Sequence, residues 1–205
     1  MTVASVYEMF NSLSTVGKQR FIEWFIGNDI STDIWNKQDI NNPGTFAMSD
    51  VIDDGYDITT SATDGHISVI NFATPKPFNP RASVSIQVAR RVLRDVTMGG
   101  IKMNGAPDQA GTERQCFITG ATFYEAQSSD GTATTVATDI AIDTAFHLWR
   151  ILGGSADIQY SIDGILKVTK TTNRSTQIMQ PYICGRATPA GVSQVRIKYL
   201  EVYNT

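Results

Sequence analysis

Acidic side chains are the residues whose types and spacing could do chemistry in this 205-residue chain. Carboxylates two residues apart on a strand share one face, where a pair can act as general acid and base. The chain has five glutamates, none of which begins a Glu-x-Asp motif: Glu8, Glu23, Glu113, Glu125 and Glu201. Asp157 and Asp163 flank glycine-containing turns, so we interpret them as turn formers. The sequence therefore predicts no catalytic residue, and we expect a protein that is not an enzyme.

Metal ligands are also sparse. The two histidines, His66 and His147, are too few for a histidine-rich metal site, and we interpret His147 as a packed or hydrogen-bonded strand residue. Asp53, Asp54 and Asp57 have the oxygen ligands that Ca²⁺ prefers, although a solvated turn is the favoured interpretation. A nucleophile elbow, a Walker A motif and a dinucleotide fingerprint are absent from the sequence. We expect no metal and no cofactor, with Ca²⁺ as the open alternative, and we assign no ligand-binding residue.

Composition and charge are those of an ordinary globular protein. Hydrophobic residues make up 41% of the chain and charged residues 18%, so a core can form. The net charge of -3 argues against nucleic-acid binding, and we interpret the short cluster Arg90, Arg91 and Arg94 as solvated. Cys116 and Cys184 both lie in apolar strand-like stretches, which favours buried thiols over a disulfide framework.

Export and membrane insertion are not predicted. The start, MTVASVYEMF, lacks the basic and continuously apolar regions of a signal peptide. The chain also lacks a run of about 18 apolar residues, which a membrane-spanning helix would need. We therefore expect synthesis in the cytoplasm and no membrane insertion.

A short helix is predicted at the N-terminus, over residues 1–17. Ser5 and Glu8 have the spacing of a capping box, and Gly17 can end the helix. The apolar residues that follow the cap recur at helical spacing, and four of them form the predicted contact surface: Val6, Met9, Phe10 and Leu13. A helix of about three turns is unstable alone. It must pack either on its own domain or on a neighbouring subunit.

The remainder, residues 18–205, is predicted to be one all-β domain. Val84, Ile86 and Val88 alternate with polar residues, as on a half-buried strand. In Phe146 to Leu166, two apolar runs flank GGSAD, and Asp163-Gly164 supplies a tight hairpin turn. About a dozen such segments, with turns every 8–12 residues or so, indicate a sandwich or barrel.

Several of these segments resemble concanavalin A-like jelly rolls, the lectin and glucanase sandwich that includes laminin G-like domains. The strongest matches are Phe146-His147-Leu148-Trp149-Arg150-Ile151 and the hairpin from Ile158 to Gly164. The stretches 25–35, 44–60 and 197–203 match in the same order. The resemblance implies a two-sheet antiparallel jelly roll. Glycosidases of this fold carry Glu-x-Asp-x-(x)-Glu on one strand, and this chain departs from them in lacking it.

A short N-terminal helical segment before a lectin-like sandwich also resembles small structural proteins of marine tailed phages. That resemblance implies a non-enzymatic virion structural protein, such as a capsid decoration protein or another small head or tail component. It would be a homo-oligomer that contacts other virion proteins, located in the virion. The alternative is a lectin-like receptor-recognition module that binds a host glycan, with Tyr56 or Tyr124 as a stacking surface.

Overall fold

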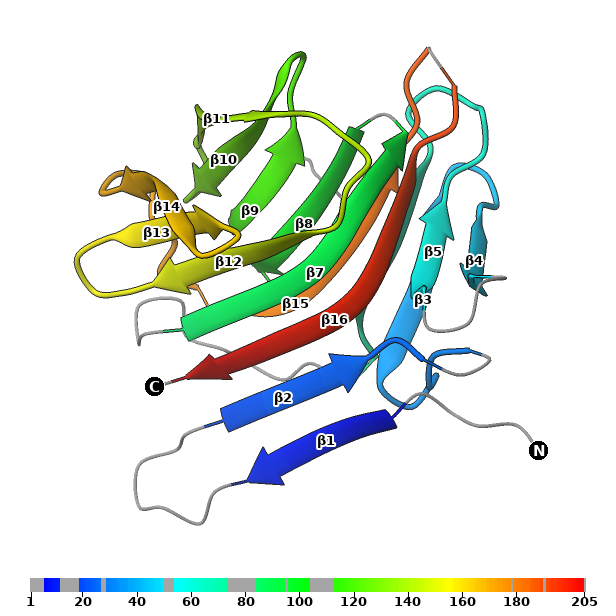
Figure 1. The fold of residues 1–205 in the computed structure, drawn as a ribbon, viewed down its shortest axis with the longest axis horizontal. Helices are drawn as coiled ribbons and strands as arrows, with labels where there is room; N and C mark the ends of the chain where they lie inside the picture. Colours follow the sequence, from blue (N-terminus) through cyan, green and yellow to red (C-terminus); the bar gives the residue numbers. More distant parts are fainter. Residues whose placement is uncertain are drawn as a thin grey trace.

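Two antiparallel sheets stack as a sandwich, shown in Figure 1. The computed structural model describes residues 6–11, 19–26, 29–49, 54–73, 84–94, 96–103, 113–177, 179–189 and 191–204. Within these ranges there is no helix, and therefore none that could cross a membrane. The predicted all-β jelly-roll sandwich is confirmed.

The first sheet has nine strands and contains both β1 and β16. Its strands follow the order β1 (Val6–Asn11), β2 (Gln19–Trp24), β16 (Gln194–Asn204), β7 (Val84–Arg94), β12 (His147–Gly153), β13 (Ile158–Ile162) and β14 (Ile165–Lys170). Beside this path, β5 (Tyr56–Thr59) pairs with β16, and β4 (Thr45–Met48) pairs with β5. The strand β16 therefore has three partners and holds this sheet together.

The second sheet has seven strands. Their order is β11 (Ala133–Ala141), β10 (Phe123–Ser129), β9 (Arg114–Thr119), β8 (Val96–Met103), β15 (Met179–Arg186), β6 (Ile67–Phe72) and β3 (Trp35–Ile40). Every neighbouring pair in this order is antiparallel.

Aromatic rings fill the space between the sheets. The Phe117 ring of β9 lies 4.9 Å from Trp149 and 5.3 Å from Tyr160, both in edge-to-face contact. Residues 158–162 alternate between buried and half-buried, so the apolar members of this strand point to the other sheet as their spacing predicts. The Tyr160 hydroxyl donates to the carbonyl of Gln127 at 2.7 Å, which satisfies its buried polar atom.

The Asp163-Gly164 turn is confirmed as the link between β13 and β14. Asp163 has φ 52° and Gly164 has φ 79°. Two consecutive positive φ angles are the requirement of a type I′ hairpin turn, whose twist matches that of the flanking strands.

The predicted N-terminal helix is wrong. Val6–Asn11 is a strand, β1, paired with β2 from Val6 opposite Trp24 to Asn11 opposite Gln19. A short isolated helix is marginal, whereas six paired residues gain backbone hydrogen bonds from an existing sheet edge. Three of the four predicted contact residues lie in β1, and Leu13 lies outside the described residues. Their role in an interface stays a prediction.

Gly100 provides a test of how tightly β8 and β9 approach. A Cβ atom at Gly100 would lie 2.2 Å from the backbone oxygen of Gln115 and 2.7 Å from the Cα of Cys116. We expect Gly100→Ala to lower the free energy of unfolding by about 1–3 kcal/mol, measured by urea unfolding, because backbone must move. Gly154→Ala is the matched control, since its nearest contact would be at an ordinary 3.5 Å. Equal stabilities of the two variants would contradict the close approach.

Candidate functional site

The candidate site lies on the outer face of the seven-stranded sheet, meaning the face turned away from the nine-stranded sheet. Side chains alternate along each strand, so Phe117 points into the core while Cys116 and Ile118 point outward. The outward residues form a small second apolar cluster with Val69, Tyr182 and their neighbours. This face is therefore built from residues that the main core does not use.

A line of hydrogen-bonding residues crosses this outer face from one edge to the other. Residues directly opposite each other in paired strands share a face. The register places one residue from each strand in the line: Thr135, Gln127, Cys116, Gly100, Tyr182, Asn71 and Asn36. We call these seven residues the polar row. At about 4.8 Å per strand, the row is about 29 Å long.

Gly100 lies at the centre of the polar row, between Cys116 and Tyr182. Because Gly100 has no side chain, the residues on either side of it can approach, and the Tyr182 side chain hydrogen-bonds Cys116. Burial raises the pKa of Tyr182 well above its ordinary value. Cys116 and Cys184 are both buried and neither is in a disulfide, which confirms the prediction of buried thiols.

Arg114 holds the amide of Gln127 in a fixed orientation. Its Nε donates to Gln127 Oε1 at 2.5 Å, and Gln127 Nε2 donates to Thr135 Oγ1 at 3.1 Å. Arg114 and Gln127 are each 7% exposed. One part of the row is thus polar, buried and hydrogen-bonded within the protein.

Two other amides on the same face carry carbonyl oxygens without a partner. Asn71 belongs to the polar row, and Gln180 precedes Tyr182 by two residues on β15. Asn71 is 7% exposed and Gln180 is 2% exposed. Asn71 Oδ1 and Gln180 Oε1 accept no hydrogen bond. An unsatisfied buried acceptor costs about 1–3 kcal/mol, so both positions oppose stability. Sequence alone could not reveal them, because their burial depends on which strands pair.

Carboxylates are missing from the middle of this face. The strands β6, β8, β9 and β15 contain no Asp or Glu. Glycoside hydrolysis typically uses two carboxyl groups about 5–9.5 Å apart, and these four strands cannot supply them. Glu125 of β10 is on the outer face, and the absence of a side chain at Gly120 makes room for its carboxylate. Glu113 lies just before β9 and accepts a hydrogen bond from Ser175 Oγ.

The acidic turn considered for Ca²⁺ is bound by an arginine. Arg196 Nε and Nη2 donate to the two oxygens of Asp57 at 2.5 and 2.6 Å, and Arg196 Nη1 pairs with Asp54. A bidentate guanidinium occupies the oxygens that a cation would need. Asp53 lies outside the described residues, among which no cluster of three or more His, Cys, Asp or Glu side chains could hold a metal.

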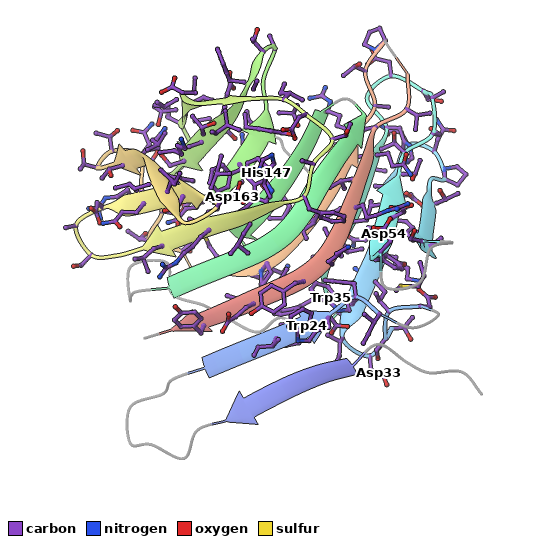
Figure 2. The ribbon with its side chains drawn as sticks, in the orientation of Figure 1. Trp24, Asp33, Trp35, Asp54, His147 and Asp163 are labelled. Carbon is purple, nitrogen blue, oxygen red and sulfur yellow. The ribbon has the colours of Figure 1, made fainter. Side chains whose placement is uncertain are left out.

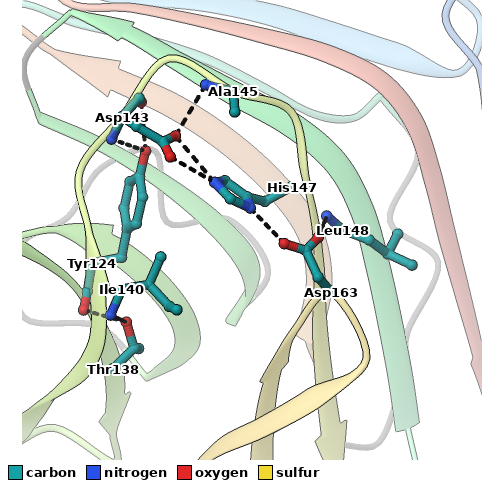
Figure 3. A network of polar contacts seen from close by, with 8 residues as sticks. All are labelled: Tyr124, Thr138, Ile140, Asp143, Ala145, His147, Leu148 and Asp163. Carbon is teal, nitrogen blue, oxygen red and sulfur yellow. Dashed lines mark hydrogen bonds and ion pairs between the residues drawn. The ribbon is translucent and has the colours of Figure 1, made fainter.

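His147 joins two carboxylates at one end of the sandwich, as Figure 3 shows. Its Nδ1 lies 2.6 Å from Asp163 Oδ2, and its Nε2 lies 3.0 Å from Asp143 Oδ1. The other Asp163 oxygen accepts from the Leu148 N–H at 2.8 Å, and the Tyr124 hydroxyl donates to the Asp143 carbonyl. The interpretation of His147 as a hydrogen-bonded strand residue is confirmed. The cluster fixes the turn before β12 and the hairpin after β13.

These contacts shift the pKa values of His147 and Asp163. Partial burial lowers the pKa of His147, but hydrogen bonds and charge from Asp163 and Asp143 outweigh it and the net pKa is raised. Partial burial raises the pKa of Asp163, but the hydrogen bonds from His147 and the Leu148 amide leave it lowered.

The two tyrosines considered for sugar stacking are both fully buried. Tyr56 hydrogen-bonds Asp29 at 3.2 Å, and the Tyr124 ring packs 4.6 Å from Trp149. Neither ring has a face available for a ligand. Figure 2 instead shows Trp24 at the surface of the nine-stranded sheet, where it is 52% exposed.

Comparison with solved structures finds glucanases of the same fold. A β-glucanase of Bacillus licheniformis is 12% identical with TM-score 0.64, and the match covers 100% of both chains. A β-1,3-1,4-glucanase (lichenase) from a mouse hindgut metagenome is 10% identical with TM-score 0.66, covering 90% of this chain and 98% of that one. A pseudo β-1,3-glucanase of Mycobacterium tuberculosis is 12% identical with TM-score 0.56, covering 85% and 92%. No family model matches the sequence, and no curated protein is similar to it.

The comparisons overturn the functional expectations drawn from the sequence. A virion structural protein without enzymatic activity is contradicted, because the structural neighbours are carbohydrate-active glycoside hydrolases. The resemblance to phage proteins depended on an N-terminal helix that is a strand. Identities of 10–12% show the fold alone, so the chemistry must be argued from this chain's own residues.

The His147 cluster predicts a pH-dependent stability. A histidine whose pKa in the folded protein lies above its unfolded value of about 6.5 makes its full contribution to the free energy of unfolding below about pH 6.5. This contribution is lost as the pH rises through the pKa of the folded protein. We therefore expect the free energy of unfolding of the wild type to fall more between about pH 5.5 and about pH 8.5 than that of His147→Gln. Urea unfolding at both pH values measures it, and parallel profiles would contradict the raised pKa.

Proposed function

We propose that the protein acts on carbohydrate and binds a β-linked glucan as substrate along the polar row. The observation that carries this proposal is the pair of buried amide oxygens, on Asn71 and Gln180, that accept no hydrogen bond. Sugar hydroxyls are donors in close succession along a chain. Both oxygens are buried in the free protein, so a sugar hydroxyl reaches either one only after the amide turns toward the ligand. The hydrogen bond then removes the cost of about 1–3 kcal/mol of the unsatisfied acceptor.

The composition of the polar row supports a neutral, hydroxyl-rich ligand. Amides both donate and accept, so Asn36 can match hydroxyl groups in either orientation. The row extends across all seven strands for about 29 Å, which suits an oligosaccharide segment better than one sugar. Support for a β-glucan comes from the neighbours of this fold that are named as β-1,3-1,4-glucanase and laminarinase.

Glu125 is the residue that we propose as the proton donor for glycosidic cleavage. Its carboxyl group protonates the leaving glycosidic oxygen, a water molecule adds to the anomeric carbon, and the proton that this water releases restores the carboxyl group. It lies on β10 two residues from Gln127, and therefore on the same face and beside the row. A general acid within reach of the leaving oxygen contributes about 100-fold to 10,000-fold in rate.

The binding proposal predicts opposite effects on stability and affinity. In the double variant Asn71→Leu/Gln180→Met, two buried unsatisfied acceptors are replaced by apolar groups of similar size. We expect the free energy of unfolding to be unchanged or raised, because their desolvation cost disappears. Calorimetry should show the affinity for a β-1,3-1,4-glucan hexasaccharide weakened about 10-fold to 30-fold, since two hydrogen bonds of about 1 kcal/mol each are lost.

Gln115→Met is the matched control for that pair. Gln115 is 1% exposed and its Oε1 is also unsatisfied, but it lies on the core side of β9 with Phe117. We expect a similar gain in stability with unchanged hexasaccharide affinity. Equal loss of affinity in the control and the double variant would contradict a site on the outer face.

The catalytic proposal is tested with Glu125→Gln. We expect the wild type to release reducing ends from β-1,3-1,4-glucan, and the variant to lose at least about 100-fold in kcat while keeping hexasaccharide affinity. Glu113→Gln is the comparison, because its carboxylate already contacts Ser175. An undiminished rate in Glu125→Gln, or a wild type that binds the glucan without cleaving it, would overturn this role.

A further inference from the structure

Phe123 is an exposed aromatic residue on the same face of β10 as Glu125. Tyr124 and Ala126 are fully buried in the core, so Phe123 and Glu125, which alternate with them, point outward. Phe123 is 39% exposed and Glu125 is half-buried. At the usual rise per residue their Cα atoms are about 7 Å apart. An aromatic ring that the core does not use therefore lies next to a carboxyl group.

The Glu125 carboxylate leans toward the Phe123 end of the strand. A Cβ atom at Gly120 would lie 2.5 Å from Glu125 Oε1 and 2.6 Å from its Cδ, so the carboxylate lies directly against this glycine. Gly120 also donates its N–H to the Phe123 carbonyl at 3.0 Å. Among the residues that the structure describes, no hydrogen bond or ion pair engages the Glu125 carboxylate. It is therefore available to a ligand beside Phe123.

The strands on either side leave these two side chains uncovered. Phe123 is opposite Ala141 of β11, and Glu125 is opposite Ala137, so only methyl groups flank them on that side. On the other side, Gly120 has no side chain. A ligand can therefore approach the Phe123 ring and the carboxylate together.

A β-bulge in β11 lies between the two alanines. Residues 138–140 face a single residue of β10, Tyr124, and Asp139 in the middle has a positive φ of 63°. Thr138 Oγ1 donates to the Tyr124 carbonyl at 2.7 Å (Figure 3), and Ile140 packs on the core. Asp139 is exposed and turns away from the core. Bulges often occur next to active sites, where they redirect a side chain, and this one brings a second carboxylate to the same end of the two strands.

An aromatic ring beside carboxylates has the chemistry of a sugar subsite. The face of the ring can cover the C–H groups on one face of a pyranose, and carboxylate oxygens accept hydrogen bonds from the hydroxyls at its edge. A protonated carboxyl group can also donate, which is the role proposed for Glu125.

We propose that Phe123 is the stacking platform of the sugar subsite at which Glu125 acts. The inference rests on the proposed function for its ligand and reaction, and it adds the residue that seats the sugar next to the cleaved bond. One glucose ring stacks on Phe123, its glycosidic oxygen lies at the Glu125 carboxyl group, and its hydroxyls reach Asp139. Gln127 of the polar row is about 7 Å beyond Glu125 along β10, so the glucan continues from this subsite into the row.

Steady-state kinetics on β-1,3-1,4-glucan test the platform with three substitutions. Phe123→Ala and Phe123→Leu remove the ring, and we expect each to raise KM at least about tenfold and to change kcat much less, because stacking holds the sugar similarly before and during the reaction. Glu125→Gln is expected to show the opposite pattern. Phe123→Tyr keeps the ring and should keep the wild-type KM. Thermal unfolding checks that each variant is folded.

Trp24→Ala is the matched control for loss of an exposed ring. Trp24 is 52% exposed but lies on the other sheet, so its loss should leave KM unchanged. An equal rise of KM in Trp24→Ala and Phe123→Ala would contradict the location of the subsite. A wild-type KM in Phe123→Leu would contradict stacking, because leucine keeps apolar bulk without a ring face.

The outcomes separate this inference from the proposed function. A wild type that cleaves the glucan, with an unchanged KM in Phe123→Ala, would overturn the subsite alone. If the wild type binds a β-1,3-1,4-glucan hexasaccharide without cleaving it, a weaker calorimetric affinity of Phe123→Ala would support the subsite and overturn the role of Glu125. A wild type that neither binds nor cleaves would overturn both.

Discussion

The register of the antiparallel strands is the constraint on which the rest of this structure depends. Side chains alternate strictly along a strand, so a shift of one residue would exchange every inward and outward position. With the observed register, Phe117 meets Trp149 and Tyr160 inside the sandwich. The same register aligns the polar row across the seven strands of the other face. The core and the proposed site are therefore two consequences of one set of pairings.

Sequence patterns predicted the features that depend on residues close together in the chain. They failed where pairing between distant strands determines the structure. The alternation of residues 158–162 and the Asp163-Gly164 turn require neighbours only a few residues away, and both are as predicted. Val6–Asn11 fits a helix by spacing, but β2 provides a partner that the sequence cannot show. Likewise, Asn71 and Tyr182 are more than 100 residues apart in the chain, and only the fold makes them neighbours. The candidate site could not have been found without that pairing.

This chain has the fold of glucanases, but the central strands of its seven-stranded sheet lack the paired carboxylates that glycoside hydrolysis typically uses. Its central strands carry amides, two thiols and a tyrosine where paired carboxylates would be needed. Leaving two buried amide oxygens unsatisfied opposes folding, so an apolar replacement would serve stability better. Residues that lower stability without contributing to the core are typical of binding surfaces, where function and stability compete.

The position of β16 has a consequence for how the chain reaches its fold. Residues 194–204 follow all other described strands in the sequence, yet they lie between β2 and β7. Until they are synthesised, β2 can pair only with β1 and β7 only with β12, so the edge of each strand that faces β16 is exposed during translation. Such edges favour association between chains. In this protein those two edges are covered only once residues 194–204 have left the ribosome and paired with β2 and β7.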